Sequence, residues 1–171
     1  SLLSGLLIHS ANDAAFILAG DNETERKAFV ERMNDIAREY DLNETHFVNF
    51  SGEEDLGHLS SAFDLAQLAR LGLKNPIFRQ LVQVKDKLIY DQSRNISYQL
   101  ENTNELLSEF DYVKGVKTGW TPQAGECLIS LVYLDDNPIL IVVLGSEDRF
   151  ANTKKLIHWS QKNLVWQQMK N

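Results

Sequence analysis

The sequence predicts an α+β fold, in which a helical region is followed by an antiparallel sheet with a C-terminal helix packed on it. Three observations support this. The first half carries apolar residues at helical spacing, the second half contains three strand-like runs, and a helical segment follows the last run. With 171 residues, 43% of them hydrophobic and 24% charged, the chain can form one domain with a core.

Two short helices are expected at the start. Leu2, Leu3, Leu6 and Leu7 have helical spacing, and this helix is expected to stop near His9. Ser10 then offers an N-cap for a second helix, with Asp13 at the capping-box position before the apolar run "AAFILAG". Residues 10–12 are therefore expected in a tight connection between the two helices.

Three further helices complete the expected helical region. The third covers residues 23–40, and one face of it carries Phe29, Met33, Ile36, Ala37 and Tyr40. The fourth covers residues 60–73, with Ser61 and Asp64 as a capping box. The dipeptide Asn75-Pro76 interrupts the chain before a fifth, short helix.

The second half changes to strands. Residues 83–90 are compatible with a strand, and a short helix is expected within 102–110. Strands are then predicted over 113–119, 126–134 and 138–145, and the turn "DDNP" should pair the last two antiparallel. The helix predicted over 149–166 closes the fold.

The first of these three strands contains Lys117-Thr118-Gly119, which is unusual in the middle of a strand. Alternation places Lys117 and Gly119 on one face and Thr118 on the other. A cation, a hydroxyl and a glycine that lets another backbone approach would suit an extended peptide ending in a carboxylate. The alternative is a solvated lysine and a glycine at a strand end.

Ser10-Ala11-Asn12 also has two interpretations. It can serve only as a helix cap. Alternatively, the Ser10 hydroxyl relays a proton and the Asn12 amide binds substrate, both from an exposed rim between two helices.

Taken together, these motifs resemble those of the serine D-alanyl-D-alanine carboxypeptidases, the low-molecular-weight penicillin-binding proteins. The resemblance covers nearly the whole chain. It is carried by "LLIHSANDAA", "THFVNFSG", "HLSSAFDLAQLA", "NTNELL", "VKGVKTGWTPQAGECLISL" and "ILIVVLGSEDRFANTKKLIHW". It implies a β-lactamase/DD-peptidase-like fold and a serine-type D-Ala-D-Ala carboxypeptidase that acts through an acyl-enzyme.

Such enzymes are defined by three motifs: S-x-x-K, S-x-N and K-T-G. No serine of this chain begins an S-x-x-K. We therefore expect residues 1–171 to be part of a DD-peptidase domain and to be inactive alone. The nucleophilic serine and its lysine are expected in an upstream segment of the same protein, which would be a partner of this chain. The sequence "NFSGEEDLG" also departs from the Gly-Leu-Asp typical of its loop.

The resemblance implies a role for each candidate residue. The catalytic residues would be Ser10 as proton relay, Asn12 as a ligand of the substrate amide, and Lys117 as a positioned cation. The substrate-binding residues would be Thr118 and Arg149 for the terminal carboxylate, Gly119, and Trp120 with its backbone N–H in the oxyanion hole. Arg149 could instead pair with Glu147 or Asp148, and the Trp120 indole could be plain packing.

The resemblance also implies the setting. Substrates would be peptidoglycan stem peptides, β-lactam antibiotics would acylate the enzyme, and its role would be in cell wall biogenesis and cell shape. The location would be extracytoplasmic, in the periplasm or on the outer face of a bacterial cytoplasmic membrane. The alternatives are a non-catalytic peptidoglycan-binding module and a class A β-lactamase-like hydrolase. Ala11 disfavours the latter, since S-D-N is typical there.

Composition excludes some other functions. A net charge of −7 argues against nucleic acid as a partner. The histidines do not cluster at metal-ligand spacing, so we expect no metal and no cofactor.

Overall fold

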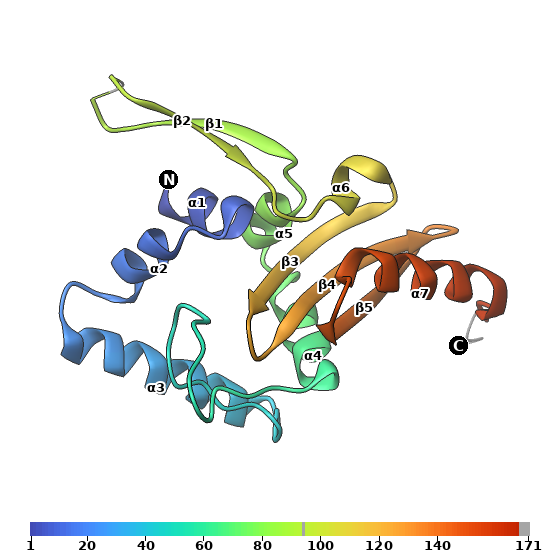
Figure 1. Cartoon of the computed structure of the whole chain (residues 1–171), viewed down its shortest axis with the longest axis horizontal. Helices are drawn as coiled ribbons and strands as arrows, with labels where there is room; N and C mark the ends of the chain where they lie inside the picture. The colour runs from blue at the N-terminus through green and yellow to red at the C-terminus, as the bar shows by residue number, and fades with distance from the viewer. Residues whose placement is uncertain (94, 168–171) are drawn as a thin grey trace.

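The structure is a computed structural model, and it describes residues 1–93 and 95–167 (Figure 1). The order of elements is helices first and a sheet second, as predicted. The helices are α1 (Leu2–His9), α2 (Asn12–Ala19), α3 (Glu23–Glu39), α4 (Ala62–Gly72), α5 (Pro76–Val82), α6 (Leu106–Glu109) and α7 (Arg149–Asn163). The strands are β1 (Asp86–Tyr90), β2 (Ser97–Glu101), β3 (Val113–Thr121), β4 (Gly125–Leu134) and β5 (Asn137–Ser146).

The main sheet is antiparallel, in the order β3-β4-β5. Its register pairs Lys117 with Ile129 and Gly119 with Cys127. Asp135 and Asp136 adopt positive φ angles in the predicted turn between β4 and β5, which suits a tight hairpin. Within the described residues, β3 has no neighbour on its outer edge, so its backbone is free to pair there.

Helices cover both faces of this sheet (Figure 1). One face packs against α6 and α7, where Leu128, Val132 and Ile157 are buried. The other face packs against α4 and α5, where Leu131 lies in a cluster with Val82. Alternating strand residues therefore supply both layers of the core, and the position of β3 is fixed from both sides.

The prediction that Ser10 caps the second helix is wrong. The N-cap of α2 is Ala11, which has no side-chain cap, and Ser10 instead ends α1 with left-handed φ and ψ of 56° and 37°. The backbone N–H of Ala11 donates to Gly5 O at 3.1 Å, which closes the end of α1. The hydroxyl of Ser10 instead accepts a hydrogen bond from the ammonium group of Lys117.

The predicted caps of the later helices are confirmed in part. Ser61 Oγ accepts from the backbone N–H of Asp64 at 3.2 Å. Asp64 does not return the bond. Its buried carboxylate accepts from Glu44 N and Thr45 Oγ1 at 2.9 and 2.8 Å. The short helix expected after Asn75-Pro76 is α5, and Asn75 is its N-cap, with Pro76 in the first turn.

The predicted apolar face of α3 is only partly buried. Ala37 is buried, whereas Phe29 and Tyr40 are exposed. The reason is that α3 lies at the margin of the molecule and packs mainly on α2 and the following loop (Figure 1).

A small hairpin and a few boundaries differ from the prediction. The strand predicted from residue 83 begins at Asp86 and pairs with β2, which the sequence analysis did not identify. The strand containing the K-T-G motif extends to Thr121, and the last helix ends at Asn163 rather than at residue 166. No helix among the described residues is both long and apolar enough to span a membrane.

Candidate active site

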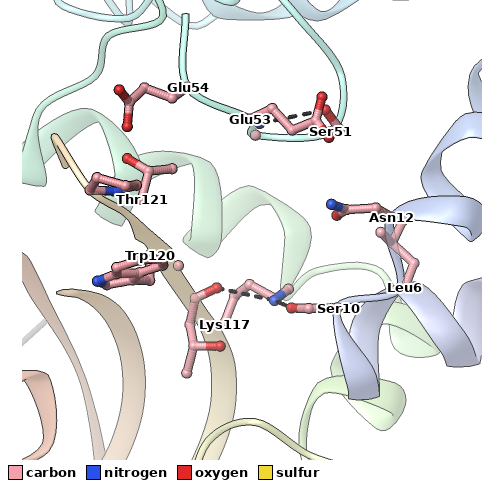
Figure 2. A pocket seen from close by; sticks show the side chains of 13 residues that line it. Leu6, Ser10, Asn12, Ser51, Glu53, Glu54, Lys117, Trp120 and Thr121 are labelled. Carbon is pink, nitrogen blue, oxygen red and sulfur yellow. Dashed lines mark hydrogen bonds between the residues drawn. The ribbon is translucent and has the colours of Figure 1, made fainter. Parts of the chain in front are cut away.

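A cleft of about 470 Å³ lies where α1 and α2 meet the end of β3 (Figure 2). The loop at 51–54 forms its far wall. It is lined by Leu6, Ser10, Asn12, Ser51, Gly52, Glu53, Glu54, Lys117, Thr118, Gly119, Trp120, Thr121 and Pro122. Both motifs singled out in the sequence therefore face one cavity.

Lys117 joins the two motifs. Its ammonium group donates a hydrogen bond to Ser10 Oγ and another to Thr118 O, the latter at 3.1 Å. Ser10 and Lys117 therefore lie within hydrogen-bonding reach, although they are 107 positions apart in the sequence. An ammonium group has three donors, so one remains for a ligand or water.

The environment of Lys117 changes its acidity. Burial and, second, the positive charge of Arg149 lower the pKa of Lys117 from 10.5 to about 8. The group remains mostly cationic at neutral pH but holds its proton far less tightly than an exposed lysine. A poised proton donor of this kind is a common feature of catalytic sites.

Asn12 lies on the opposite rim from Lys117. It is the first residue of α2, it is exposed, and its amide points into the cleft (Figure 2). A primary amide can donate and accept at once, which matches a peptide group.

Thr118 and Gly119 form the part of the strand nearest the cleft. Thr118 Oγ1 lies 2.6 Å from Thr103 Oγ1. A Cβ on Gly119 would meet only Cys127 Cβ, at 3.7 Å, so packing within the sheet does not require glycine here. The missing side chain leaves the exposed edge of β3 open to another backbone.

Arg149 is held against β3. Its Nη1 donates to Gly119 O at 3.0 Å, and its guanidinium lies 5.0 Å from the centroid of the Phe150 ring. Within the described residues it forms no ion pair with Glu147 or Asp148, which removes that alternative. Arg149 is not among the described residues that line the cleft, so it flanks the cleft.

The wall at 51–54 was not predicted from the sequence to be part of the site. This wall is the tip of a loop closed at its base by the bridge between His46 and Leu59. Glu54 Oε2 accepts from Gln123 N at 3.1 Å and so ties the loop to the end of β3. The signal available in the sequence was the departure of "NFSGEEDLG" from the pattern of its loop.

Trp120 lies at the mouth of the cleft with 63% of its surface exposed (Figure 2). The indole therefore does not pack in the core. The side of the cleft formed by α1, α2 and β3 offers a cation, hydroxyls, an amide and a free strand edge, which is a combination suited to an extended peptide with a carboxylate. Glu53 and Glu54 line the far wall.

Comparisons with known proteins agree with this arrangement. Residues 1–148 match the family model described as D-alanyl-D-alanine carboxypeptidase. The chain is 31% identical over 162 residues to D-alanyl-D-alanine carboxypeptidase DacF of Bacillus subtilis, which covers 93% of the chain and 41% of that protein. It is 33% identical over 171 residues to D-alanyl-D-alanine carboxypeptidase DacD of Escherichia coli, which covers 96% of the chain and 42% of that protein.

A solved structure is similar throughout the described fold. The crystal structure of a Streptomyces DD-transpeptidase superposes with a TM-score of 0.86 at 31% identity, covering 92% of this chain and 65% of that one. The fold predicted from the sequence is thereby confirmed. The chain spans about two-fifths of the length of the two carboxypeptidases.

Proposed function

Because the chain belongs to the D-alanyl-D-alanine carboxypeptidase family, we propose that it forms the substrate-binding and proton-transfer part of a serine D-Ala-D-Ala carboxypeptidase. One observation carries the proposal. The S-x-N serine and the K-T-G lysine, Ser10 and Lys117, are hydrogen-bonded across a cleft beside a free strand edge. If Ser10 were only a helix cap and Lys117 only a solvated surface residue, no hydrogen bond between them would be expected.

In this proposal the substrate is an extended peptide that ends in D-Ala-D-Ala. Its main chain lies along the outer edge of β3, and Asn12 binds a substrate amide. Its terminal carboxylate accepts from the Thr118 hydroxyl. Arg149, held beside Gly119, contributes positive charge at the same end of the strand.

The reaction proceeds in two steps. A serine hydroxyl gives its proton to its partner lysine and attacks the carbonyl between the two D-alanines, and the Trp120 N–H helps to stabilise the oxyanion. Ser10, held by Lys117, passes a proton to the amine that leaves as D-alanine. Water then hydrolyses the acyl-enzyme and regenerates the serine.

The 171 residues contain no S-x-x-K, the motif that carries the attacking serine and its partner lysine in such enzymes. In this proposal an upstream segment of the same protein supplies both. The substrate is the stem peptide of peptidoglycan, and β-lactams acylate the same serine. The protein works outside the cytoplasm, in the periplasm or on the outer face of the bacterial cytoplasmic membrane.

A single experiment separates this proposal from its alternatives. The full-length gene product is incubated with benzylpenicillin and, separately, with a peptide ending in D-Ala-D-Ala. Release of D-alanine and a long-lived penicilloyl adduct are expected. Rapid turnover of penicillin would indicate a β-lactamase. Peptide binding without release or labelling would indicate a binding module.

A further inference from the structure

A second threonine contacts the K-T-G motif from outside it. Thr103 Oγ1 lies 2.6 Å from Thr118 Oγ1, a short hydrogen bond between two half-buried side chains. Thr103 belongs to the segment 102–104, which follows β2 and is not part of any helix or strand. It is not among the described residues that line the cleft, so it would reach a ligand only through Thr118.

The backbone around Thr103 is fixed by its two asparagine neighbours. Asn102 Nδ2 donates to Val84 O at 2.9 Å, and Asn102 Oδ1 accepts from Asn104 N at 2.9 Å. Asn104 is buried, and its Nδ2 donates to Gly115 O on β3 at 3.1 Å. The Thr103 hydroxyl is therefore presented to Thr118 by a segment that is itself bonded to the same strand.

The direction of the hydrogen bond matters. Each hydroxyl has one proton to donate and two lone pairs that accept. A carboxylate only accepts hydrogen bonds, so the Thr118 hydroxyl must donate its one proton to the ligand. Thr103 must then be the donor to Thr118. In a series of hydrogen bonds each bond polarises the next, so the bond from Thr103 to Thr118 strengthens the bond from Thr118 to the carboxylate.

We propose that Thr103 is a positioning residue for carboxylate recognition, because it donates to Thr118 and thereby leaves the Thr118 proton for the ligand. This inference rests on the proposed function, since it requires Thr118 to bind the terminal carboxylate. Thr103 lies outside the three defining motifs, and in this role it would favour ligands with a free C-terminal carboxylate.

The test uses the full-length gene product and a non-cleavable hydroxyethylene isostere of a D-Ala-D-Ala peptide. The isostere is prepared as the free carboxylate and as the C-terminal carboxamide. The ratio of the two dissociation constants measures carboxylate preference without catalysis. Thr103→Val is expected to reduce that preference about 5- to 10-fold. Thr103→Ser, which keeps the hydroxyl, is expected to retain it.

Three controls separate this role from a structural one. Thr103→Ala should reproduce the Thr103→Val result, which guards against a packing defect in either variant. In Thr118→Val, adding Thr103→Val should cost nothing further, since the two hydroxyls act in series. Thr153→Val removes a buried hydroxyl on α7 that has no hydrogen-bond partner among the described residues, and the preference should be unchanged.

The outcomes distinguish the two proposals. If the wild-type protein binds carboxylate and carboxamide equally, the proposed function of the cleft is wrong. If the wild type prefers the carboxylate and both Thr103→Val and Thr103→Ala keep that preference, the role of Thr103 alone is wrong. If Thr103→Ser, which keeps the hydroxyl, loses the carboxylate preference as Thr103→Val does, the proposed role of the Thr103 hydroxyl is wrong.

Discussion

Lys117 is the residue on which the electrostatics of the cleft depend. Its ammonium group is hydrogen-bonded to Ser10 and Thr118, and the side chain is half-buried. Dehydration disfavours the charged form, and the nearby Arg149 charge disfavours it further. The group is thus a cation that can lose its proton near physiological pH.

The first prediction is that Lys117 titrates near pH 8 rather than near 10.5. Arg149→Gln should raise the pKa of Lys117, because it removes the repelling charge. The pKa should stay below 10.5, because burial is the larger cause. The measurement is NMR of ¹³Cε-labelled lysine, with the Lys117 resonance assigned by its loss in Lys117→Ala.

Lys154→Gln on α7 serves as the matched control, since Lys154 is paired with Glu109 away from the cleft. It should leave the Lys117 titration in place. A Lys117 pKa near 10.5 in the wild-type protein would contradict the burial of this group.

Ser10 is the proposed proton relay, and its backbone adopts an unfavourable left-handed conformation. A left-handed conformation costs a residue with a Cβ about 1 kcal/mol, and glycine avoids most of that cost. We predict that Ser10→Gly is more stable than Ser10→Ala by about 1 kcal/mol in denaturant unfolding. Both variants lack the hydroxyl and should be equally impaired in penicillin labelling.

The comparison isolates the backbone, since the two variants lose the same bond to Lys117. Equal unfolding free energies for Ser10→Gly and Ser10→Ala would show that the left-handed turn at the end of α1 carries no cost. Near-normal labelling of either variant would contradict the proposed proton relay.

At the scale of elements, the wall at 51–54 depends on how its loop is attached to α4. The buried Asp64 carboxylate accepts from Glu44 N and Thr45 Oγ1, directly before His46 and the bridge that closes the loop. Asp64→Ala leaves the Glu44 N–H without this acceptor, and Thr45 Oγ1 keeps only its contact with Ser60 Oγ at 2.8 Å. The substitution should lower the free energy of unfolding by about 1–3 kcal/mol, measured by chemical denaturation.

Asp35→Ala is the control for Asp64→Ala, because Asp35 is a half-exposed helix residue paired only with Arg38. It should change stability by less than about 0.5 kcal/mol. A cost for Asp64→Ala no larger than this would mean that Asp64 does not anchor the loop.

The elements that the sequence predicted best have strong local patterns. Ser61 and Asn75 cap their helices because their side chains reach free N–H groups, and the β4–β5 hairpin follows from apolar runs around a turn. The strand β2 was missed because only Leu100 among its residues is buried, so its pattern is weak. Ser10 was wrongly predicted to cap α2 because a cap sequence cannot reveal a distant partner that binds the hydroxyl.

At the scale of the whole molecule, the candidate site is a junction. Ser10 and Asn12 come from the helical part, Lys117 to Trp120 come from the sheet, and segment 51–54 closes the third side. No periodicity brings such residues together. The resemblance to a family did so for the two motifs, whereas Thr103 and Glu54 needed the geometry.

The central claim is that Lys117 and Ser10 form the proton-transfer pair of a penicillin-reactive cleft. The most direct measurement is the second-order rate of benzylpenicillin labelling of the full-length gene product and its Lys117→Ala variant. Lys114→Ala, on the same strand but outside the cleft, is the control. The account predicts a fall of at least about 100-fold for Lys117→Ala, with an unchanged fold by circular dichroism, and a normal rate for Lys114→Ala. Labelling of Lys117→Ala at a rate close to wild type would contradict it.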